Sequence, residues 1–575
     1  MESAIHLCEL RRELLNSPGN ILVQGGPGSG KTTIALLKAA HEIASGSLER
    51  GQRILFLSFA RATIARVAEQ ASKNISVHDL SLLEINTYHG FAWNLLRSHG
   101  YLLRKERGIK LLSPPDAAAR MAFINKDNRL AEMERLFKEE GLLHFDLFAE
   151  NALALLTQSQ SLLRIVCSVY PFIIVDEFQD TDESEWKLIQ VLGKVSRIMS
   201  LADPEQRIYE FRGASPNRIA DLKRCFMPCE FDFRFDNYRS DGTDITKYGN
   251  DLLNQTNKTR TYRNVKIKHY SVTHNTVPHL SLKYEVLNNI VQLRRSNLKE
   301  WSLGILVPSN QLMMQVSGYL NKHTVKLPSI NHEVAFDAEA ACLAAILIAS
   351  LLEGCENTNQ IVSVLICRLY TYICGHRGSK QLTADDVKLA NILQGFKTST
   401  KVTGSIKKQL YDAIYSIAEN RIAFNFSGDP ANDWESMRKL LADSDVKIIK
   451  QIAQDATYLR FLHKGSSLRS HLNEQWRKND NYVGAENHVR AALIQEQFSL
   501  GIKPPLGVHV MTIHKSKGKE FTRVIVYEGI FGGRVLTGEG DSQRKQSLLA
   551  LRVAVTRAQE QVTILTPQKS PCPFL

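Results

Sequence analysis

Short apolar runs, each followed by a helix-like segment, dominate the first part of the chain. They lie at residues 20–24, 53–57 and 172–175, with two more near Ile85 and Met199. Apolar runs of this length, bounded by polar or glycine-rich stretches, are typical of buried strands, and strands that alternate with helices form parallel sheets. The pattern therefore predicts a parallel α/β lobe.

The same pattern returns later and predicts a second lobe of the same kind. It begins near Asp221, and its strands are expected at residues 303–307, 508–512, 524–527 and 562–565. Two long stretches with helical patterning interrupt the lobes. The predicted fold class is α/β, with two parallel-sheet lobes that each carry a mainly helical insertion. The expected boundaries are 1–100 and 165–220 for the first lobe, 101–164 for its insertion, 221–336 and 501–575 for the second lobe, and 337–500 for its insertion.

Length and composition narrow the class of protein. A chain of 575 residues is too long for one core. Its net charge of +13 favours a polyanionic partner. Nine cysteines without a CxxC pair argue against a disulfide framework and a zinc ribbon. The longest apolar run, residues 341–352, is too short to span a bilayer, and the N-terminus lacks a signal-peptide pattern. We expect a cytoplasmic protein with no membrane partner.

The stretch GGPGSGKTT, residues 25–33, fits the pattern GxxxxGK[ST] and lies between a predicted strand and a predicted helix. Glycines let backbone N–H groups turn inward around phosphate oxygens, and the helix N-terminus adds positive potential. Lys31 is expected at the β- and γ-phosphates of ATP, and the Thr32 hydroxyl at Mg²⁺. The expected nucleotide-binding residues are Gly25, Gly26, Pro27, Gly28, Ser29, Gly30, Lys31, Thr32 and Thr33.

A predicted strand, residues 172–175, runs into the acidic segment DEFQDTDESE. A phosphate loop requires a second strand that ends in an acid near Mg²⁺. Asp176 is expected to bind the metal, and Glu177 to deprotonate the attacking water. Gln179 lies just beyond, at the edge of the nucleotide. Two further carboxylates are expected to lie on a solvated helix start: Glu183 and Glu185.

The DEFQD form of this segment resembles superfamily 1A helicases of the UvrD/Rep/PcrA type. The family's other motifs follow in its order: SFARAT, INTYHGFAWNLLRSHG, LADPEQRIYEFRGA, FDNYRS, MTIHKSKGKEF and VAVTRA. Together with the phosphate loop they span residues 25–558, and six motifs in a fixed order are far more specific than any one of them. The resemblance implies two RecA-like lobes, 1A and 2A, with the insertions as domains 1B and 2B.

The resemblance also implies roles for individual residues. The implied catalytic set is Lys31, Asp176, Glu177, Gln206, Arg239 and Arg557, with Arg557 as the arginine finger. Tyr238 would stack on the adenine, and Gly518 and Glu520 would lie near the nucleotide. The implied DNA contacts are Phe59, Thr87, His89, Tyr209, Phe211 and His514.

The chemistry of phosphoryl transfer agrees with this reading. A γ-phosphate transition state needs positive charge, and Arg239 and Arg557 lie far from the phosphate loop in sequence. If they come from a second lobe, ATP holds the lobes together and hydrolysis releases them, as in a motor. The basic run at residues 257–269 suits a phosphate track, although a solvated surface loop explains it nearly as well.

Two positions depart from the family's pattern. Leu10 stands about where the family has a glutamine that reads adenine, so base selectivity would rest more on Tyr238. Arg552 stands where a tyrosine is usual, directly ahead of VAVTRA. The second insertion, residues 337–500, has little family-like sequence.

We expect an ATP-dependent 3′–5′ single-stranded DNA translocase and helicase, with ATP and Mg²⁺ as cofactors and single-stranded or tailed duplex DNA as partner. The HKSKG form of residues 514–518 favours this polarity. The alternative is a regulatory ATPase that senses DNA ends or single strands and licenses a partner nuclease without unwinding. An RNA helicase is a third interpretation.

Two biological roles fit such a motor. One is DNA repair. The other is anti-phage defence, because the chain resembles the compact UvrD-like subunits of Gabija-type systems, in which a separate subunit is the nuclease. A nuclease partner is expected to bind the second insertion, residues 337–500, which is the least motor-like part of the sequence.

Overall fold

The computed structural model describes residues 8–58, 61–74, 76–104, 108–206, 214–234, 236–271, 277–296, 298, 300–323, 327–334, 339–355, 357–378, 381–398, 404–456, 467–498, 506–530, 532–536 and 540–575. The chain folds into two compact units. The first comprises Met1–Leu95, Ala149–Phe336 and Leu500–Leu575, and the second Leu96–Phe148 and Asp337–Ser499.

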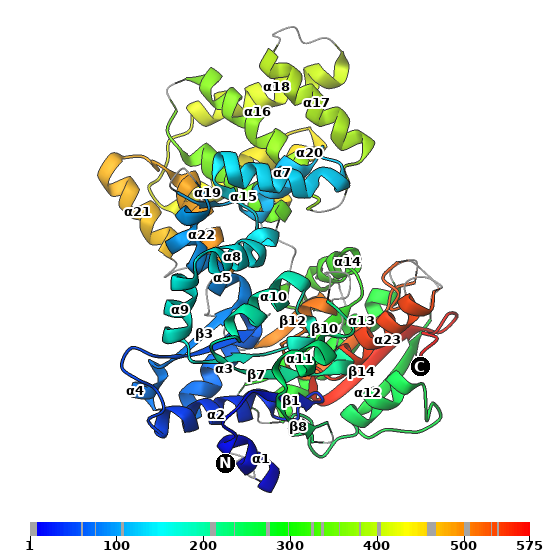
Figure 1. Ribbon diagram of the computed structural model, residues 1–575. Coiled ribbons are helices and arrows are strands. Elements are labelled where there is room, and N and C mark those ends of the chain that lie inside the picture. Colours follow the sequence, from blue (N-terminus) through cyan, green and yellow to red (C-terminus); the bar gives the residue numbers. More distant parts are fainter. Residues whose placement is uncertain are drawn as a thin grey trace. The chain divides into compact units, whose positions relative to one another are not determined.

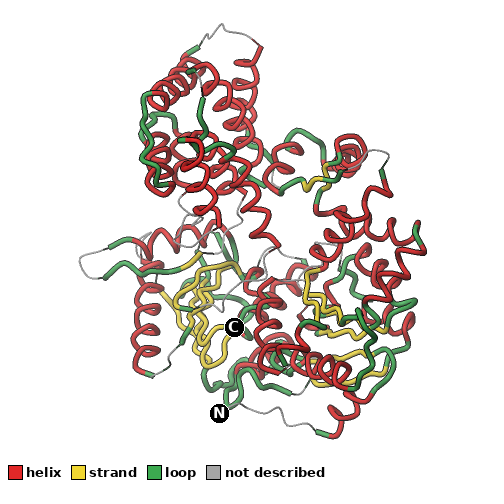
Figure 2. Tube along the Cα trace, turned by 90° about the vertical axis from the view of Figure 1, so that its left-hand side faces the viewer, coloured by secondary structure: helices red, strands yellow, loops and turns green. Residues whose placement is uncertain are grey.

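The first unit contains two six-stranded sheets, and every strand pair in them is parallel. Figure 2 shows them as two large groups of strands. Strands of parallel sheets are covered on both faces, which explains why their sequences are nearly continuous apolar runs. The predicted α/β class with two parallel-sheet lobes is confirmed. We call the parts of the first unit around these sheets the first and second lobes.

The sheet of the first lobe has the strand order β3-β2-β6-β7-β1-β8. Its strands are β1 (Ile21–Gly25), β2 (Ile54–Ser58), β3 (Leu83–Thr87), β6 (Phe172–Val175), β7 (Arg197–Ala202) and β8 (Cys229–Phe233). Helices of this lobe are α1 (Glu9–Asn16), α2 (Lys31–Ala44), α3 (Arg61–Asn74), α4 (Val77–Leu80), α5 (Tyr88–His99), α8 (Phe148–Gln158), α9 (Gln160–Val169), α10 (Glu183–Leu192) and α11 (Arg218–Phe226), as Figure 1 shows.

The sheet of the second lobe has the order β11-β12-β10-β13-β14-β9. Its strands are β9 (Val265–Tyr270), β10 (Ser302–Val307), β11 (Glu333–Val334), β12 (Gly507–Thr512), β13 (Phe521–Tyr527) and β14 (Ala558–Pro567). Two apolar clusters cover its two faces. One includes residues of α12 (Ile245–Asn254) and α23 (Asp541–Val555), and the other includes residues of α13 (Val277–Arg295) and α14 (Asn310–Asn321).

The second unit is mainly helical. From Leu96–Phe148 it takes η1 (Gly100–Leu103), β4 (Lys110–Leu111), α6 (Pro114–Met121), η2 (Lys126–Asn128), α7 (Arg129–Arg135), η3 (Leu136–Glu140), β5 (Leu142–Leu143) and η4 (Phe145–Leu147). From Asp337–Ser499 it takes α15 (Glu339–Leu352), α16 (Thr358–Gly375), α17 (Ala384–Thr398), α18 (Ser405–Ile422), α19 (Pro430–Ala442), α20 (Lys447–Asp455), α21 (Ser467–Asn479) and α22 (Ala485–Phe498).

Helix α15 is the centre of this unit, because its side chains from Ala341 to Leu352 are buried in one large apolar cluster. The long apolar run noted in the sequence is therefore a core helix. An ion pair of 2.5 Å between Arg490 of α22 and Asp116 of α6 joins the unit's two chain segments. Within the described residues, no single helix is long and apolar enough to cross a membrane. The bent helix pair Phe145–Gln158 and Gln160–Val169 passes that test by length and composition alone.

Several local features differ from the sequence predictions. Strand β8 pairs with β1, so the first sheet continues beyond the boundary expected at residue 220. Helices α8 and α9 lie mostly in the first unit rather than in an insertion that extends to residue 164. Part of the basic run at residues 257–269 forms β9, an edge strand paired with β14.

The acidic helix start is also different from the prediction. Asp182 caps α10, and the side chain of Glu185 accepts a hydrogen bond from the Asp182 N–H, which completes a capping box. Glu185 is therefore buried rather than solvated. Glu183 is exposed, as expected, and pairs with Arg218 at 3.2 Å.

Candidate active site

The phosphate loop follows β1 and ends where α2 begins. Gly28 and Gly30 have φ angles of +78° and +83°, in the left-handed region that favours glycine. The Ser29 hydroxyl is buried and has no hydrogen-bond partner among the described residues. A loop of this kind at a helix N-terminus offers N–H groups and a hydroxyl to an anion.

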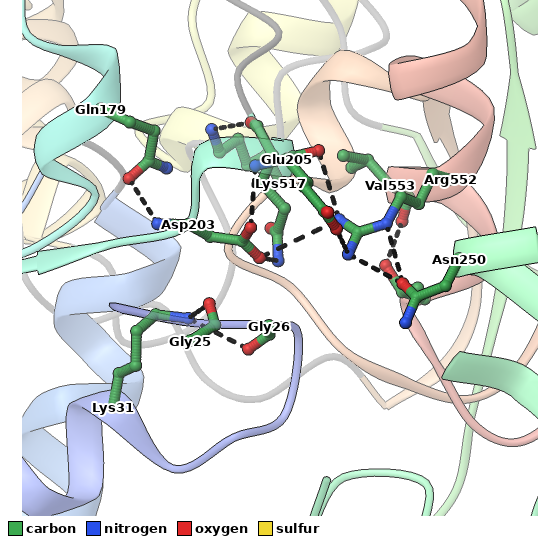
Figure 3. A network of polar contacts seen from close by, with 12 residues as sticks. Gly25, Gly26, Lys31, Gln179, Asp203, Glu205, Asn250, Lys517, Arg552 and Val553 are labelled. Carbon is green, nitrogen blue, oxygen red and sulfur yellow. Dashed lines mark hydrogen bonds and ion pairs between the residues drawn. The ribbon is translucent and has the colours of Figure 1, made fainter. Parts of the chain in front are cut away.

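Lys31 opens α2 and lies at the mouth of this loop. Its Nζ donates to the carbonyl oxygens of Gly25 and Gly26 at 2.6 and 3.1 Å (Figure 3). Burial lowers the pKa of Lys31, while the carboxylates of Asp203, Glu177 and Asp176 oppose that shift. A cation at this point of the loop can bind phosphate oxygens.

Two acids follow β6 at the carboxyl end of the sheet. The Asp176 N–H donates to Leu57 of the neighbouring strand at 2.8 Å, and the Ser58 hydroxyl donates to the Asp176 carboxylate at 3.3 Å. Glu177 has φ +52°, an uncommon conformation for a residue other than glycine. Such strain is concentrated at functional sites, and here it sets the direction of the Glu177 side chain.

The two carboxylates differ in their electrostatic surroundings. Burial and the neighbouring Glu177 raise the pKa of Asp176, with Lys31 opposing. Burial alone would also raise the pKa of Glu177, but Lys517, Lys31 and the Gln179 amide together lower it below its ordinary value. Glu177 is therefore ionised near neutral pH, as a general base must be.

Side chains of the second lobe reach these groups of the first. Lys517, just after η9 (His514–Ser516), forms a buried ion pair with Asp180 and donates to the Gln206 carbonyl at 2.8 Å. Its Nζ is also 3.7 Å from the Glu177 carboxylate. Arg557, 2% exposed, donates from Nη2 to the Gln206 side-chain oxygen at 2.8 Å.

A third contact comes from the segment that leads from β8 to α12. The Tyr238 N–H donates to the Gly28 carbonyl at 2.7 Å, which places this segment directly on the phosphate loop. Arg239 pairs with Glu520, and its Nη1 donates to the Thr556 carbonyl at 3.1 Å. Arg239 lies close enough to Lys31, and Arg557 close enough to Glu177, for each arginine to lower the pKa of its neighbour.

Comparison with known proteins agrees with this geometry. Residues 9–129 and 124–227 match the model of the UvrD/REP helicase N-terminal domain. The chain is 21% identical to the YjcD protein of Bacillus subtilis (strain 168), over 97% of this chain and 78% of that protein. It is 20% identical to the ATP-dependent DNA helicase PcrA of Staphylococcus aureus (strain MRSA252), over 94% of this chain and 80% of PcrA. Residues 9–227 of the chain are therefore similar to the UvrD/REP helicases, and the relatives extend this similarity over most of the chain. A further relative, DNA helicase II of Haemophilus influenzae, is 26% identical over 43% of this chain and 40% of its own length.

In this chain the predicted nucleotide-site residues come together from distant parts of the sequence. The phosphate loop, Asp176, Glu177, Gln179 and Gln206 belong to the first lobe. Gly518, at φ +77°, precedes Glu520, the partner of Arg239 in the second lobe. Gln179 donates to Glu177 at 2.6 Å and accepts from the Asp203 N–H at 2.9 Å, so it holds the acids in place.

The predicted DNA contacts are less fully described. Phe59, Tyr209 and Phe211 lie outside the described residues. Thr87 ends β3 and accepts a hydrogen bond from the Gly90 N–H at 2.8 Å, and His89 lies in the first turn of α5. His514 is exposed at the start of η9. Their contact with DNA stays a prediction.

Three side chains at the candidate site were not predicted from the sequence to belong to it. Lys517 lies within the motif MTIHKSKGKEF, but no feature of the neighbouring sequence indicates that it pairs with Asp180. Arg11 is buried beside Tyr238 and donates to the Tyr238 hydroxyl at 2.7 Å and to Asp236 at 2.5 Å. It follows Leu10 in the sequence, which stands about where the resemblance implies an adenine-reading glutamine. The third is Arg552, which donates to the Glu205 carboxylate at 2.6 Å.

Proposed function

We propose that this chain is a DNA-dependent ATPase and 3′–5′ helicase that moves on single-stranded DNA. The observation that carries the proposal is the pairing of second-lobe cations with first-lobe site groups: Arg557 with Gln206, and Lys517 with Asp180. Because residues of both lobes form the site, it is complete only when the lobes are together. Hydrolysis of ATP can therefore drive a change between a closed and an open arrangement of the lobes. The relatives named as ATP-dependent DNA helicases support the same activity.

Each side chain has a distinct task in this proposal. Lys31 and the loop N–H groups bind the β- and γ-phosphates. Glu177 accepts a proton from the attacking water, because it is ionised and its backbone holds it in a fixed direction. Arg239 and Arg557 stabilise the charge that develops on the γ-phosphate, and Gln206 connects Arg557 to the first lobe.

The donor set also fits Mg²⁺. The Asp176 carboxylate and the Thr32 hydroxyl are hard oxygen ligands of the kind that Mg²⁺ prefers. The acids Asp176, Glu177 and Asp203, close enough to perturb Lys31, supply the negative charge that favours a divalent cation. When bound, Mg²⁺ neutralises phosphate charge. Asp176 and Thr32 would hold it.

The phosphate loop has little room for change, which gives a direct test of the nucleotide site. A Cβ on Gly28 would lie 2.6 Å from the Arg239 Cβ and 2.7 Å from the Asn237 side-chain oxygen. Gly28→Ala should therefore displace Arg239 and the loop itself, and weaken ATP binding by about tenfold or more, because the clash moves the backbone N–H groups that would bind the phosphates. Titration with a fluorescent ATP analogue measures the change.

Gly46→Ala is the matched control. Gly46 also has a positive φ, +68°, but no atom lies within 4 Å of its added Cβ. It should lower the melting temperature slightly and leave ATP affinity unchanged. Equal ATP affinity of Gly28→Ala and the wild type would mean that this loop does not hold the phosphates.

Strand displacement tests the helicase activity and its polarity. A duplex with a 3′ single-stranded tail should be unwound with ATP, and a duplex with only a 5′ tail should not. The HKSKG form of residues 514–518 supports this polarity. If DNA stimulates ATP hydrolysis and neither substrate is unwound, the chain is a DNA-activated regulatory ATPase instead.

We place this motor in anti-phage defence or DNA repair. For the defence role, we propose that a nuclease subunit binds the helical segment Asp337–Ser499 of the second unit. Co-purification with the product of a neighbouring nuclease gene, lost when that helical segment is altered, would support the defence role. Deletion that sensitises cells to DNA damage and not to phage would contradict it and leave repair.

A further inference from the structure

A buried arginine that the proposed mechanism does not use lies beside the site. Arg552, in the last turn of α23, is 1% exposed. Figure 3 shows its guanidinium between Glu205 and Asn250. Nη2 donates to the Glu205 carboxylate at 2.6 Å and to the Asn250 side-chain oxygen at 3.0 Å, and Nη1 donates to the Glu205 carbonyl at 3.2 Å.

These contacts join the two lobes. Arg552 and Asn250 belong to helices α23 and α12 on the second sheet, whereas Glu205 lies in η6 (Pro204–Gln206), after β7 of the first sheet. Asn250 therefore holds the guanidinium from its own lobe, and Glu205 accepts from it across the boundary. Asp203 adds a second carboxylate of the first lobe, 4.0 Å from Nη1.

The same short turn carries a residue of the site. Gln206 follows Glu205, donates to Asp203 at 2.8 Å, and accepts from Arg557 at 2.8 Å. Arg557 lies five positions after Arg552 in the chain. The turn η6 is therefore held from the second lobe at two adjacent residues, by Arg552 at Glu205 and by Arg557 at Gln206.

Separation of the lobes would change both the burial and the hydrogen bonds of Arg552, whereas a surface arginine would stay solvated. Its guanidinium would lose the Glu205 carboxylate and carbonyl and keep only the neutral Asn250. Water would hydrate the separated groups, but a hydrogen bond between charged groups is more favourable than the bonds to water that would replace it. The contact therefore favours the closed arrangement, and it acts on the turn that positions Gln206.

We propose that Arg552 and Glu205 form an inter-lobe latch that positions Gln206 against Arg557 and so sets the rate of hydrolysis. The inference rests on the proposed ATPase function. Arg552 is a positioning residue, because it reaches the reacting groups through η6.

The test compares kcat and KM for ATP with DNA present. Arg552→Gln and Glu205→Gln should each lower kcat by about 10- to 100-fold, as expected for loss of a hydrogen bond between charged groups, with little change in KM. Arg552→Lys keeps the positive charge and should recover part of the rate. Lys545→Gln, an exposed position on the same helix, is the matched control and should behave as wild type.

Glu205→Gln separates a latch from a purely structural role. Half of the Glu205 side chain is exposed (50%), so its replacement should leave the melting temperature unchanged while kcat falls. A structural Arg552 would instead give a lower melting temperature in Arg552→Gln and a normal kcat in Glu205→Gln. That result would overturn the proposal.

A double-mutant cycle completes the test. If the pair acts as one unit, the variant that carries both Arg552→Gln and Glu205→Gln should be no slower than the slower single variant. Additive losses would contradict the latch. A wild-type chain that hydrolyses no ATP with DNA would refute the proposed function, whereas a normal rate in Glu205→Gln beside an active wild type would refute the latch alone.

Discussion

Arg557→Ala should lower the DNA-stimulated kcat for ATP hydrolysis by about a thousandfold or more, the range that arginine fingers contribute. Arg557 is buried, comes from the second lobe, and contacts Gln206 of the first. Its charge is needed most in the transition state, so the apparent affinity for ATP should change much less than kcat. Steady-state ATP hydrolysis with saturating single-stranded DNA measures both quantities.

Arg544→Ala is a suitable control, because Arg544 is exposed on α23 in the same lobe. It should keep the wild-type kcat. A normal kcat in Arg557→Ala would remove this residue from the catalytic set, and a parallel loss of ATP affinity would make it a binding residue instead.

Glu177→Gln should bind ATP and DNA and almost stop turnover. The amide has nearly the same shape as the carboxylate but cannot accept a proton from water, and a positioned base contributes about 10²–10⁴-fold. Lys31→Ala, unlike Glu177→Gln, should also weaken nucleotide binding, because it removes the ammonium that would contact the phosphates. Single-turnover hydrolysis and equilibrium binding of ATP distinguish the two variants.

Glu183→Gln is the matched control for Glu177→Gln, because the two acids belong to the same segment and Glu183 is exposed. It should hydrolyse ATP at the wild-type rate. Near wild-type turnover in Glu177→Gln would assign the base to another group, and Asp180 would be the next acid to examine, since it is buried beside Lys517.

The parts of the fold that local sequence encodes were predicted well. Parallel strands covered on both faces must be apolar along their length, so runs such as Phe172–Val175 identify them directly. The turn of the phosphate loop is equally local, since its glycines occupy the positive-φ positions that the pattern requires. Strand β8, CEFDF, was missed because its exposed and buried residues alternate at the sheet edge and no continuous apolar run marks it.

Contacts between distant residues could not be predicted in the same way. Arg552 and Glu205 are separated by 347 positions, and Lys517 and Asp180 by 337. A charged residue gives the same local pattern whether it is solvated or pairs with a distant acid. Arg11 illustrates the point, because it lies in a charged helix, Glu9–Asn16, and is nevertheless buried against Tyr238. The capping role of Glu185, in contrast, could have been predicted from the sequence. Asp182 and Glu185 form a D-x-x-E pattern ahead of an apolar run, which is typical of a capping box.

The most direct test of the central claim is the rate of ATP hydrolysis by the wild-type chain with single-stranded DNA, single-stranded RNA and blunt duplex DNA, measured side by side with Mg²⁺. A site completed by two lobes of a DNA motor predicts a low basal rate, strong stimulation by single-stranded DNA, and little stimulation by RNA or blunt duplex. A rate that is the same with and without any nucleic acid would contradict the account.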